Sequence, residues 1–192
     1  MILAQHYTPV IQTWKDPISS SRQVSRRSVW SVDGTKPKIC QGGIILRRFA
    51  RIAGYAHVSD LPMPERKTGK SAGYDLSAAE TVSLDPGNAV LVPTGVKVYM
   101  EPDEVLLIFI RSSLAVKHHL ILANQVGVID GDYVDNPDNE GQILVPLLNW
   151  GTEPVVVQRG ERIAQAIFVR FAITDDDRAE GDRSGGFGST GR

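Results

Sequence analysis

From residue 44 onward, the chain is a series of short apolar or β-branched runs separated by glycine, proline, asparagine and aspartate. Runs of this length with turn residues between them are typical of strands. The expected strands cover residues 44–53, 74–84, 89–92, 96–100, 105–110, 120–128, 142–148, 155–157 and 163–171. Helical character is confined to residues 112–119, so the helices that a doubly wound sheet requires are missing. The pattern predicts an all-β domain, a barrel of jelly-roll type.

The composition divides the chain into three parts. Residues 1–42 hold the polar stretch SSSRQVSRRS without sustained periodicity, which predicts a flexible N-terminal extension. Residues 43–171 carry the strand-like runs of the expected domain. Residues 172–192 are acidic and rich in glycine, and such a segment cannot bury a core of its own. We therefore expect one folded domain with a flexible segment at each end.

Charge and cysteine content limit the function classes. The 192 residues include 42% hydrophobic and 22% charged side chains, which suits a globular domain with a proper core. A formal net charge of -1 gives no support to a nucleic-acid partner or an anionic membrane. Apolar runs also stay well below the roughly 20 residues of a membrane span. Cys40 is the only cysteine, which excludes an internal disulfide and fits a cytoplasmic protein.

The stretch NQVGVIDGDY, residues 124–133, combines a strand pattern with closely spaced carboxylates. Period-two alternation would place Val126, Val128 and Asp130 on one side of a strand. Asp130 would then project into whatever this hairpin cradles. The alternative is that GDY is an ordinary hairpin turn, in which Asp130 is merely solvated.

Two further motifs lie before this stretch. In SAGYDL, Gly73 allows close backbone approach and Asp75 lies near a strand start. In IRSSLA, Arg111 follows a strongly apolar strand, while Ser112 and Ser113 open the short helix. A serine there is commonly an N-cap, but the two hydroxyls beside an arginine could also bind an anion.

Two more motifs lie after it. RGERIAQ places Arg162 and Gln165 in an otherwise apolar strand, where they could also pair with carboxylates at a subunit surface. GGFGSTG, residues 185–191, has backbone N–H groups that could form a phosphate nest, with Phe187 able to cover a flat ring. It lacks the GK[ST] of a Walker A loop, so the alternative is a flexible tail.

The five motifs, in this order, closely resemble those of the trimeric dUTP diphosphatases (dUTPases). The resemblance spans roughly residues 51–192 and ends with the glycine-rich motif at the end of the chain. It implies a small jelly-roll-like β-barrel, the dUTPase-like β-clip, assembled as a homotrimer. Three sites would lie at subunit interfaces, with exchange of the C-terminal arm from one chain over a site built by others.

The resemblance also implies roles for residues of the central stretch. Asn124 and the backbone of Val126, Gly127 and Val128, with Ile129 beside them, would bind the uracil edge and exclude cytosine and thymine. Tyr133 would pack against the deoxyribose and leave no room for a 2′-hydroxyl.

The remaining motifs would bind the phosphates. Arg111, Ser112, Ser113 and Gln165 would contact or order the phosphate chain. In the arm, Phe187 would lie over the base. Arg183, Ser189 and Thr190 would bind the terminal phosphate as the arm closes, and Gly188 is a further substrate-binding residue of the arm.

The implied reaction is hydrolysis of dUTP to dUMP and diphosphate, which keeps uracil out of DNA and supplies dUMP for dTMP synthesis. Asp130 would hold the water that attacks the α-phosphorus. One Mg²⁺ would be bound mainly through the substrate phosphates, as Mg²⁺ prefers. Asp75 is a candidate for holding a metal-bound water or a neighbouring arginine.

The sequence departs from the family pattern in two places. VDNPDNE, residues 134–140, is longer than the tight turn of many family members. The spacing from Arg183 to Phe187 is one residue shorter than in RGxGGF, which makes Arg178 an alternative ligand of the terminal phosphate.

Two other functions compete with this interpretation. dCTP deaminases resemble dUTPases and carry a similar RSSLA segment, but LVPLLN places Pro146 where they have a glutamate. A proline there also predicts an edge or irregular strand. The second alternative is a regulatory protein that binds a protein partner through the N-terminal extension or residues 134–140.

Overall fold

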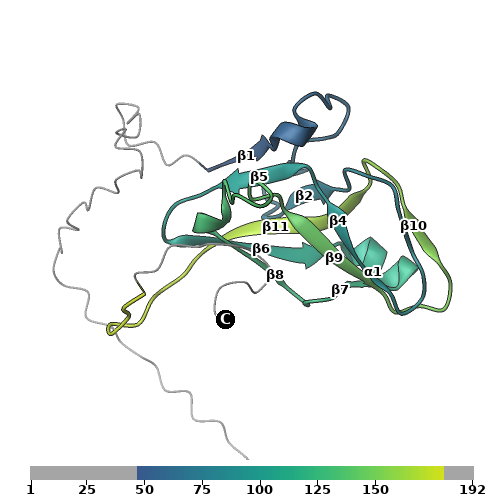
Figure 1. Ribbon diagram of the computed structural model, residues 1–192. Coiled ribbons are helices and arrows are strands. Elements are labelled where there is room, and N and C mark those ends of the chain that lie inside the picture. The colour runs from purple at the N-terminus through teal and green to yellow at the C-terminus, as the bar shows by residue number, and fades with distance from the viewer. Residues whose placement is uncertain (1–46, 180–192) are drawn as a thin grey trace, which may run out of the picture. The chain divides into compact units, whose positions relative to one another are not determined.

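The computed structural model describes residues 47–179, which form mainly β-strands and a single α-helix (Figure 1). The predicted extension over residues 1–42 and the arm residues from 180 onward lie outside the described part. The strands are β1 Arg48–Arg51, β2 Tyr74–Ser77, β3 Val82–Leu84, β4 Ala89–Pro93, β5 Val96–Tyr99, β6 Glu104–Ile110, β7 Leu120–Leu122, β8 Gly127–Asp130, β9 Leu144–Asn149, β10 Val155–Val157 and β11 Arg162–Arg170. The helix α1 is Ser112–His118, and two short 3-10 turns are η1 Ala53–Tyr55 and η2 Gly131–Tyr133.

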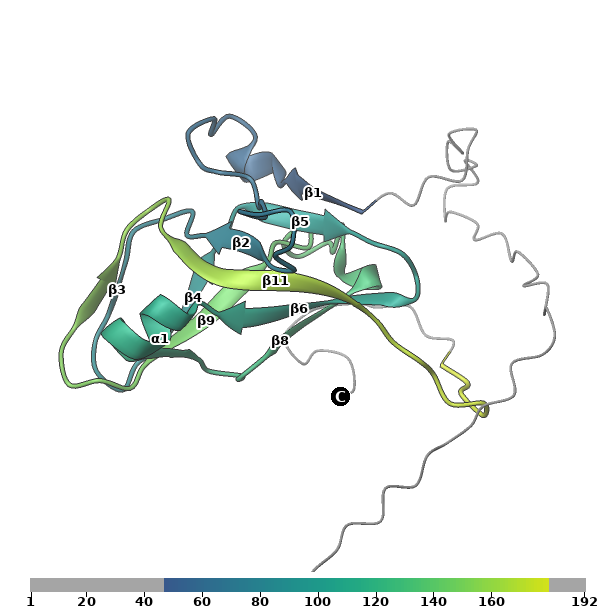
Figure 2. The ribbon, with the colours of Figure 1, turned by 180° about the vertical axis from the view of Figure 1, so that it is seen from behind.

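The strands pair in antiparallel fashion within four small sheets. A four-stranded sheet has the order β2-β11-β6-β8, and a three-stranded sheet has the order β4-β9-β7. Figures 1 and 2 show β11 running between β2 and β6. Strands β1 and β5 form one further pair, and β3 and β10 form another. The mostly-β prediction is confirmed, as is a short helix after β6.

Two of the expected strands are divided, which corrects the sequence prediction. The run over residues 74–84 becomes β2 and β3 because residues between them bond elsewhere: Ala78 N donates to Glu161 O, and Ala79 N to Pro93 O. The run over residues 120–128 becomes β7 and β8, separated by a turn in which Gln125 has a φ of +64°. Both breaks lie at polar residues inside runs that the sequence analysis treated as single strands, Glu80 and Thr81 in the first and Asn124 and Gln125 in the second.

One hydrophobic core joins the buried faces of all these sheets. Burial of each large aliphatic side chain stabilises the fold by about 1.5–3 kcal/mol, before conformational entropy is subtracted. The largest fully buried side chains are Leu76, Leu84, Leu106, Ile108, Leu120, Leu122, Ile143, Leu147 and Ile163. They come from strands far apart in sequence, so the core depends on long-range pairing.

Pro146 lies in the middle strand of the three-stranded sheet, and the expectation of an edge strand is wrong. It pairs with Leu91 of β4, while its carbonyl accepts from Ala123 N at 2.8 Å. The N and C=O of a strand residue point to the same side, so the missing N–H faces Ala123, just past the end of β7. No bond of the β4–β9 ladder is therefore lost.

A buried carboxylate opens β6. Glu104 is only 4% exposed and accepts hydrogen bonds from Arg47, with Nε 2.7 Å from Oε2. Its carboxylate also accepts from Glu101 N at 3.3 Å. The hydrogen bond from Arg47 lowers the pKa of Glu104 below its ordinary value, and burial opposes this effect without reversing it.

The lowered pKa predicts a pH-dependent stability. Because the folded state favours the ionised carboxylate, its contribution is present above about pH 4.5 and is lost as the pH falls through the lowered pKa. We expect Glu104→Gln to be less stable than the wild type at neutral pH, with the difference shrinking on acidification. Urea unfolding followed by circular dichroism across this range measures it. A difference that stays constant with pH would contradict the assignment.

Candidate active site

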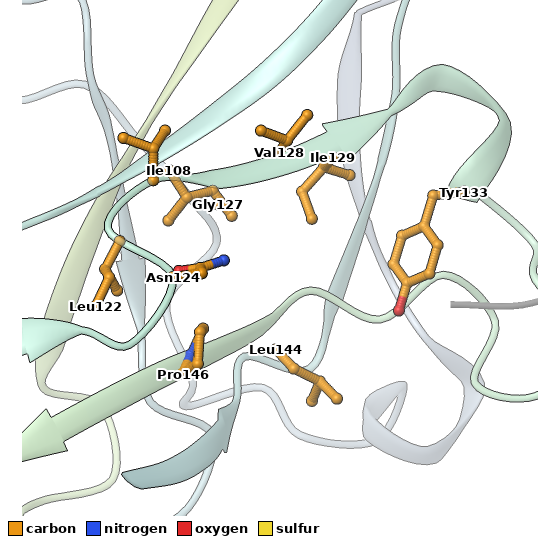
Figure 3. A pocket seen from close by; sticks show the side chains of 10 residues that line it. Ile108, Leu122, Asn124, Gly127, Val128, Ile129, Tyr133, Leu144 and Pro146 are labelled. Carbon is orange, nitrogen blue, oxygen red and sulfur yellow. The ribbon is translucent and has the colours of Figure 1, made fainter. Parts of the chain in front are cut away.

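A cavity of about 330 Å³ opens between β8 and β9, where β7 ends (Figure 3). Its wall combines backbone from one short strand with apolar side chains and two polar ones, an amide and a phenol. The lining residues are Ile108, Leu122, Asn124, Val126, Gly127, Val128, Ile129, Tyr133, Leu144 and Pro146. Six of these ten residues belong to the stretch that the sequence analysis selected.

Close packing of β8 on β6 shapes one side of the cavity. Gly127 pairs with Ile108, and a Cβ added at this glycine would lie 3.0 Å from Ile108 Cβ. The preceding turn is held by Gln125 N, which donates to Leu122 O at 2.9 Å. Asn124 is thereby placed at the cavity, in the turn between the two strands. The glycine lets β8 approach its neighbour closely, because a Cβ at this position would make a tight contact with Ile108.

Tyr133 forms the opposite end of the cavity. Its ring lies in η2, across the opening from Asn124 (Figure 3). The side chain is largely buried, and its hydroxyl donates to Gln142 O at 3.2 Å and accepts from Asn139 Nδ2 at 2.7 Å. A flat, anchored ring therefore faces the amide of Asn124.

Asp130 is not one of the residues that line this cavity. The expectation that it projects into whatever the hairpin cradles stays a prediction. Asp130 ends β8, pairs with Val105 of β6 and is exposed, like Val128 two residues before it. The alternation itself is present, because Gly127 is buried and Ile129 is half-buried. The carboxylate lies on the exposed face of β8, where another molecule can reach it.

The expected phosphate-binding residues lie outside the cavity. Arg111 occupies the N-cap position of α1, with Ser112 and Ser113 exposed in its first turn. No side chain caps this helix within the described residues, so the N-cap interpretation of the serines is wrong. Gln165 is exposed on β11, where it pairs with Phe109 of β6 and lies next to Gly73. The remaining expected ligands, Arg183, Phe187, Gly188, Ser189 and Thr190, lie outside the described residues.

Asp75 joins three of the motifs. Its carboxylate is buried and lies 2.8 Å from Arg162 Nη1 and 3.4 Å from Arg111 Nε. Arg111 Nη1 also donates to Arg162 O at 3.2 Å. Two guanidinium groups share one carboxylate, which leaves the cluster with an excess positive charge. Such a cluster holds Arg111 in place and favours anions nearby.

Gly73 allows this region to pack closely. A Cβ there would lie 3.1 Å from Gln165 Cβ and 3.2 Å from its Oε1. The sequence predicted close approach at this glycine, and the structure identifies the neighbouring side chain as Gln165.

The described residues offer no cluster of three or more His, Cys, Asp or Glu side chains that could hold a metal ion. Asp75 is engaged by two arginines. The available donors therefore suit a Mg²⁺ ion held by phosphate oxygens and water rather than by a protein cage.

Four cavity residues were missed by the sequence analysis, namely Ile108, Leu122, Leu144 and Pro146. All four lie in strands, in β6, β7 and β9. An apolar residue in a strand-like run does not by itself indicate whether it packs in the core or lines a cavity.

The chain matches the dUTPase family model over residues 59–191. It is 47% identical over 148 residues to the deoxyuridine 5′-triphosphate nucleotidohydrolase of Lactococcus lactis subsp. lactis, covering 76% of this chain and 98% of that protein. The enzyme of the same name from Hahella chejuensis is 40% identical over 141 residues, covering 69% and 89%. The crystal structure of a dUTPase from Streptococcus mutans superposes with a TM-score of 0.63 at 46% identity, covering 66% and 98%.

The fold and the cavity define a mostly-β nucleotide-binding protein of the kind these relatives represent. The chain belongs to the dUTPase family. Within the described residues, no helix is long and apolar enough to span a membrane.

The contact between Gly127 and Ile108 generates a prediction about the cavity wall. We expect Gly127→Ala to destabilise the protein by about 1–3 kcal/mol, because the added methyl group overpacks the β6–β8 contact. This corresponds to a fall of about 2–4 °C in Tm per kcal/mol. Gly131→Ala is the matched control, since its Cβ would be 3.7 Å from the nearest atom. Differential scanning calorimetry of both variants tests this, and equal Tm values would contradict it.

Proposed function

We propose that this chain is a dUTP diphosphatase that hydrolyses dUTP to dUMP and diphosphate. Membership of the dUTPase family supports the activity. The observation that carries it is the cavity, in which an asparagine amide, backbone of β8 and a tyrosine ring lie together. The reaction would remove dUTP from the pool available for DNA synthesis and supply dUMP for dTMP synthesis.

The base is recognised by hydrogen bonds along one edge and by shape. Uracil presents two carbonyl acceptors on either side of an N–H donor, and the Asn124 amide offers both a donor and an acceptor. Cytosine carries an amine in place of one carbonyl, so a donor in the site would be left facing a donor. The thymine methyl group would need room against the apolar side chains Ile108 and Leu122. A site that hydrogen-bonds its ligand rejects mismatched groups strongly.

The sugar is recognised by Tyr133. A flat ring packed against deoxyribose leaves no space for the additional hydroxyl of ribose. The ring is held at the cavity by the two hydrogen bonds to its hydroxyl.

The phosphates are bound by residues from more than one chain of a homotrimer. Arg111, Ser112, Ser113 and Gln165 lie away from the cavity of their own chain, which supports sites shared between subunits. The C-terminal arm of a further chain would close the site, with Phe187 over the base. Its phosphate ligands would be Gly188, Ser189, Thr190 and Arg183, or Arg178 in place of Arg183.

The reaction is an in-line attack of water on the α-phosphorus. Asp130 accepts a proton from the water or orients it, a new P–O bond forms, and the bond to the diphosphate leaving group breaks. Exposure of Asp130 on the outer face of β8 is compatible with a reaction centre completed by another chain. Fixed donors, the serine hydroxyls and arginines, stabilise the charge that develops on the phosphate oxygens.

We propose Mg²⁺ as the metal, held by substrate phosphates and water. When bound, it supplies charge neutralisation on the triphosphate. On the protein side, the arginines arranged by Asp75 would hold the phosphates that bind the ion.

The deaminase alternative is disfavoured by the composition of the cavity. None of the described residues that line it carries a carboxylate, and Pro146 occupies the wall at the position considered for glutamate. A regulatory partner bound through residues 1–42 stays a proposal for a region outside the described residues.

The activity is tested with dUTP, dCTP, dTTP and UTP in the presence of Mg²⁺. We expect diphosphate from dUTP alone. Asp130→Asn should lower kcat by about 10²-fold to 10⁴-fold, because it removes a positioned base, while the Kd for dUMP changes little. Diphosphate and ammonia release are measured together. Ammonia from dCTP would establish a deaminase, and loss of dUMP binding in the variant would assign Asp130 a structural role.

The role of Asp75 is tested without metal. Asp75→Asn should destabilise the metal-free protein by about 1–3 kcal/mol, less than for a fully buried ion pair because both arginines are partly exposed. Asp60→Asn, which breaks an exposed pair with Arg159, is the control and should cost at most about 1 kcal/mol. Thermal unfolding with and without Mg²⁺ measures both. A change in Asp75→Asn seen only with Mg²⁺ would instead favour a metal-bound water at this carboxylate.

A further inference from the structure

The segment 134–140, which lies between η2 and β9, folds back on itself. Asp135 N donates to Glu140 O at 3.2 Å, and Glu140 N donates to Asn136 O at 2.7 Å. Asp135 and Glu140 both have left-handed backbone conformations, with φ of 58° and 59°. Gly141 follows with a φ of 75°, and a Cβ there would lie 2.4 Å from Tyr133 O. The segment is therefore a compact loop that closes tightly on the residue lining the cavity.

The loop is anchored to the domain by charged groups. Asp135 forms an ion pair with Lys97 of β5, and its hydrogen bond raises the pKa of Lys97. The Glu140 carboxylate accepts from Ala53 N at 3.0 Å. Asn136 is buried, and its Oδ1 accepts from Asp138 N at 2.9 Å. The contacts with Lys97 and Ala53 tie the loop to the rest of the domain, and the bond to Asn136 lies within the loop.

Asn139 connects this fixed loop to the cavity. Its Nδ2 donates to Tyr133 Oη at 2.7 Å, and its Oδ1 accepts from Gly141 N at 3.0 Å. The same phenol hydroxyl donates to Gln142 O at 3.2 Å. The tyrosine oxygen is thus held between one donor and one acceptor, and both belong to the loop or its C-terminal continuation.

We propose that Asn139 is a positioning residue that fixes the ring of Tyr133 and thereby sets the discrimination between deoxyribose and ribose. The inference rests on the proposed function and deepens it. It gives the additional length of residues 134–140 a role in substrate selection.

The discrimination depends on the position of the Tyr133 ring, because a small displacement of the ring would make room for the extra hydroxyl of ribose. A ring that excludes one hydroxyl group works only while it is held within about 0.5 Å of its place. Without the Asn139 donor, the Tyr133 hydroxyl loses the bond from Asn139 Nδ2, while its bond to Gln142 O remains, and the ring gains freedom to move. The extra hydroxyl of a ribonucleotide is then tolerated more readily.

The first experiment compares kcat/KM for dUTP and UTP in the wild type and in Asn139→Ala. We expect the dUTP-to-UTP ratio to fall about 2-fold to 10-fold, the range that corresponds to one net hydrogen bond. Asp138→Ala is the control, because Asp138 is an exposed neighbour in the same loop and its substitution should leave the ratio unchanged. An unchanged ratio in Asn139→Ala overturns the inference.

A double-mutant cycle with Tyr133→Phe separates this role from general support of the loop. The phenylalanine variant keeps the ring and removes the hydroxyl, so Asn139→Ala should change the ratio no further in that background. The bond from Gly141 N to Asn139 is lost in either background. A further fall of similar size in the double variant would show that Asn139 acts through the loop backbone, which overturns the inference.

Binding of dUMP and UMP, measured by calorimetry, gives a readout that needs no turnover. We expect Asn139→Ala to narrow the difference in Kd between the two nucleotides. Wild-type protein that binds neither nucleotide and hydrolyses neither triphosphate contradicts the proposed function itself. Wild-type protein that hydrolyses dUTP selectively, with the same selectivity in the variant, contradicts only the role of Asn139.

Discussion

The antiparallel pairing of β6 with its two neighbours is the constraint on which the rest of the molecule depends. On one side β8 lies against it, with Gly127 opposite Ile108, and on the other β11 pairs along its whole length. The end of β6 leads directly into Arg111 and the helix, while β8 leads into Asp130 and Tyr133. A single register therefore places the cavity between β8 and β9, the carboxylate at the end of β8 and the arginine cluster relative to one another.

The cluster around Asp75 adds a second level of organisation. Asp75, Arg111 and Arg162 come from three strands or strand ends that are separated along the chain. Both arginines pair with the Asp75 carboxylate. The single carboxylate compensates one of the two guanidinium charges, so a net positive charge stays close to the sheet. The chain as a whole has a net charge of -1. A local excess of positive charge, such as this cluster of arginines, is what allows an anion site on a chain of this composition.

Much of the fold and part of the site could be predicted from residue patterns. Alternation in β8 correctly separated Gly127 from Val128, and close approach was correctly expected at Gly73, because both depend on short-range geometry. The turn at Gln125 was not predicted, although Asn124 beside it and Gly127 two residues on are turn residues, because the apolar residues on either side also fit a single strand. For Asp130, alternation gave the right face of the strand but not what faces it. That depends on the packing of other segments, and for a shared site on other chains.

Pro146 has a consequence for how the site can change. Its position gives the cavity wall a backbone that already uses its carbonyl toward Ala123 and offers no donor. Replacement by any other residue would introduce an N–H group at this wall together with the new side chain. A carboxylate could not be acquired here without also altering the main-chain hydrogen bonding at the cavity wall. The hydrolase and the deaminase that we compared would therefore differ at this position in the backbone as well as in a side chain.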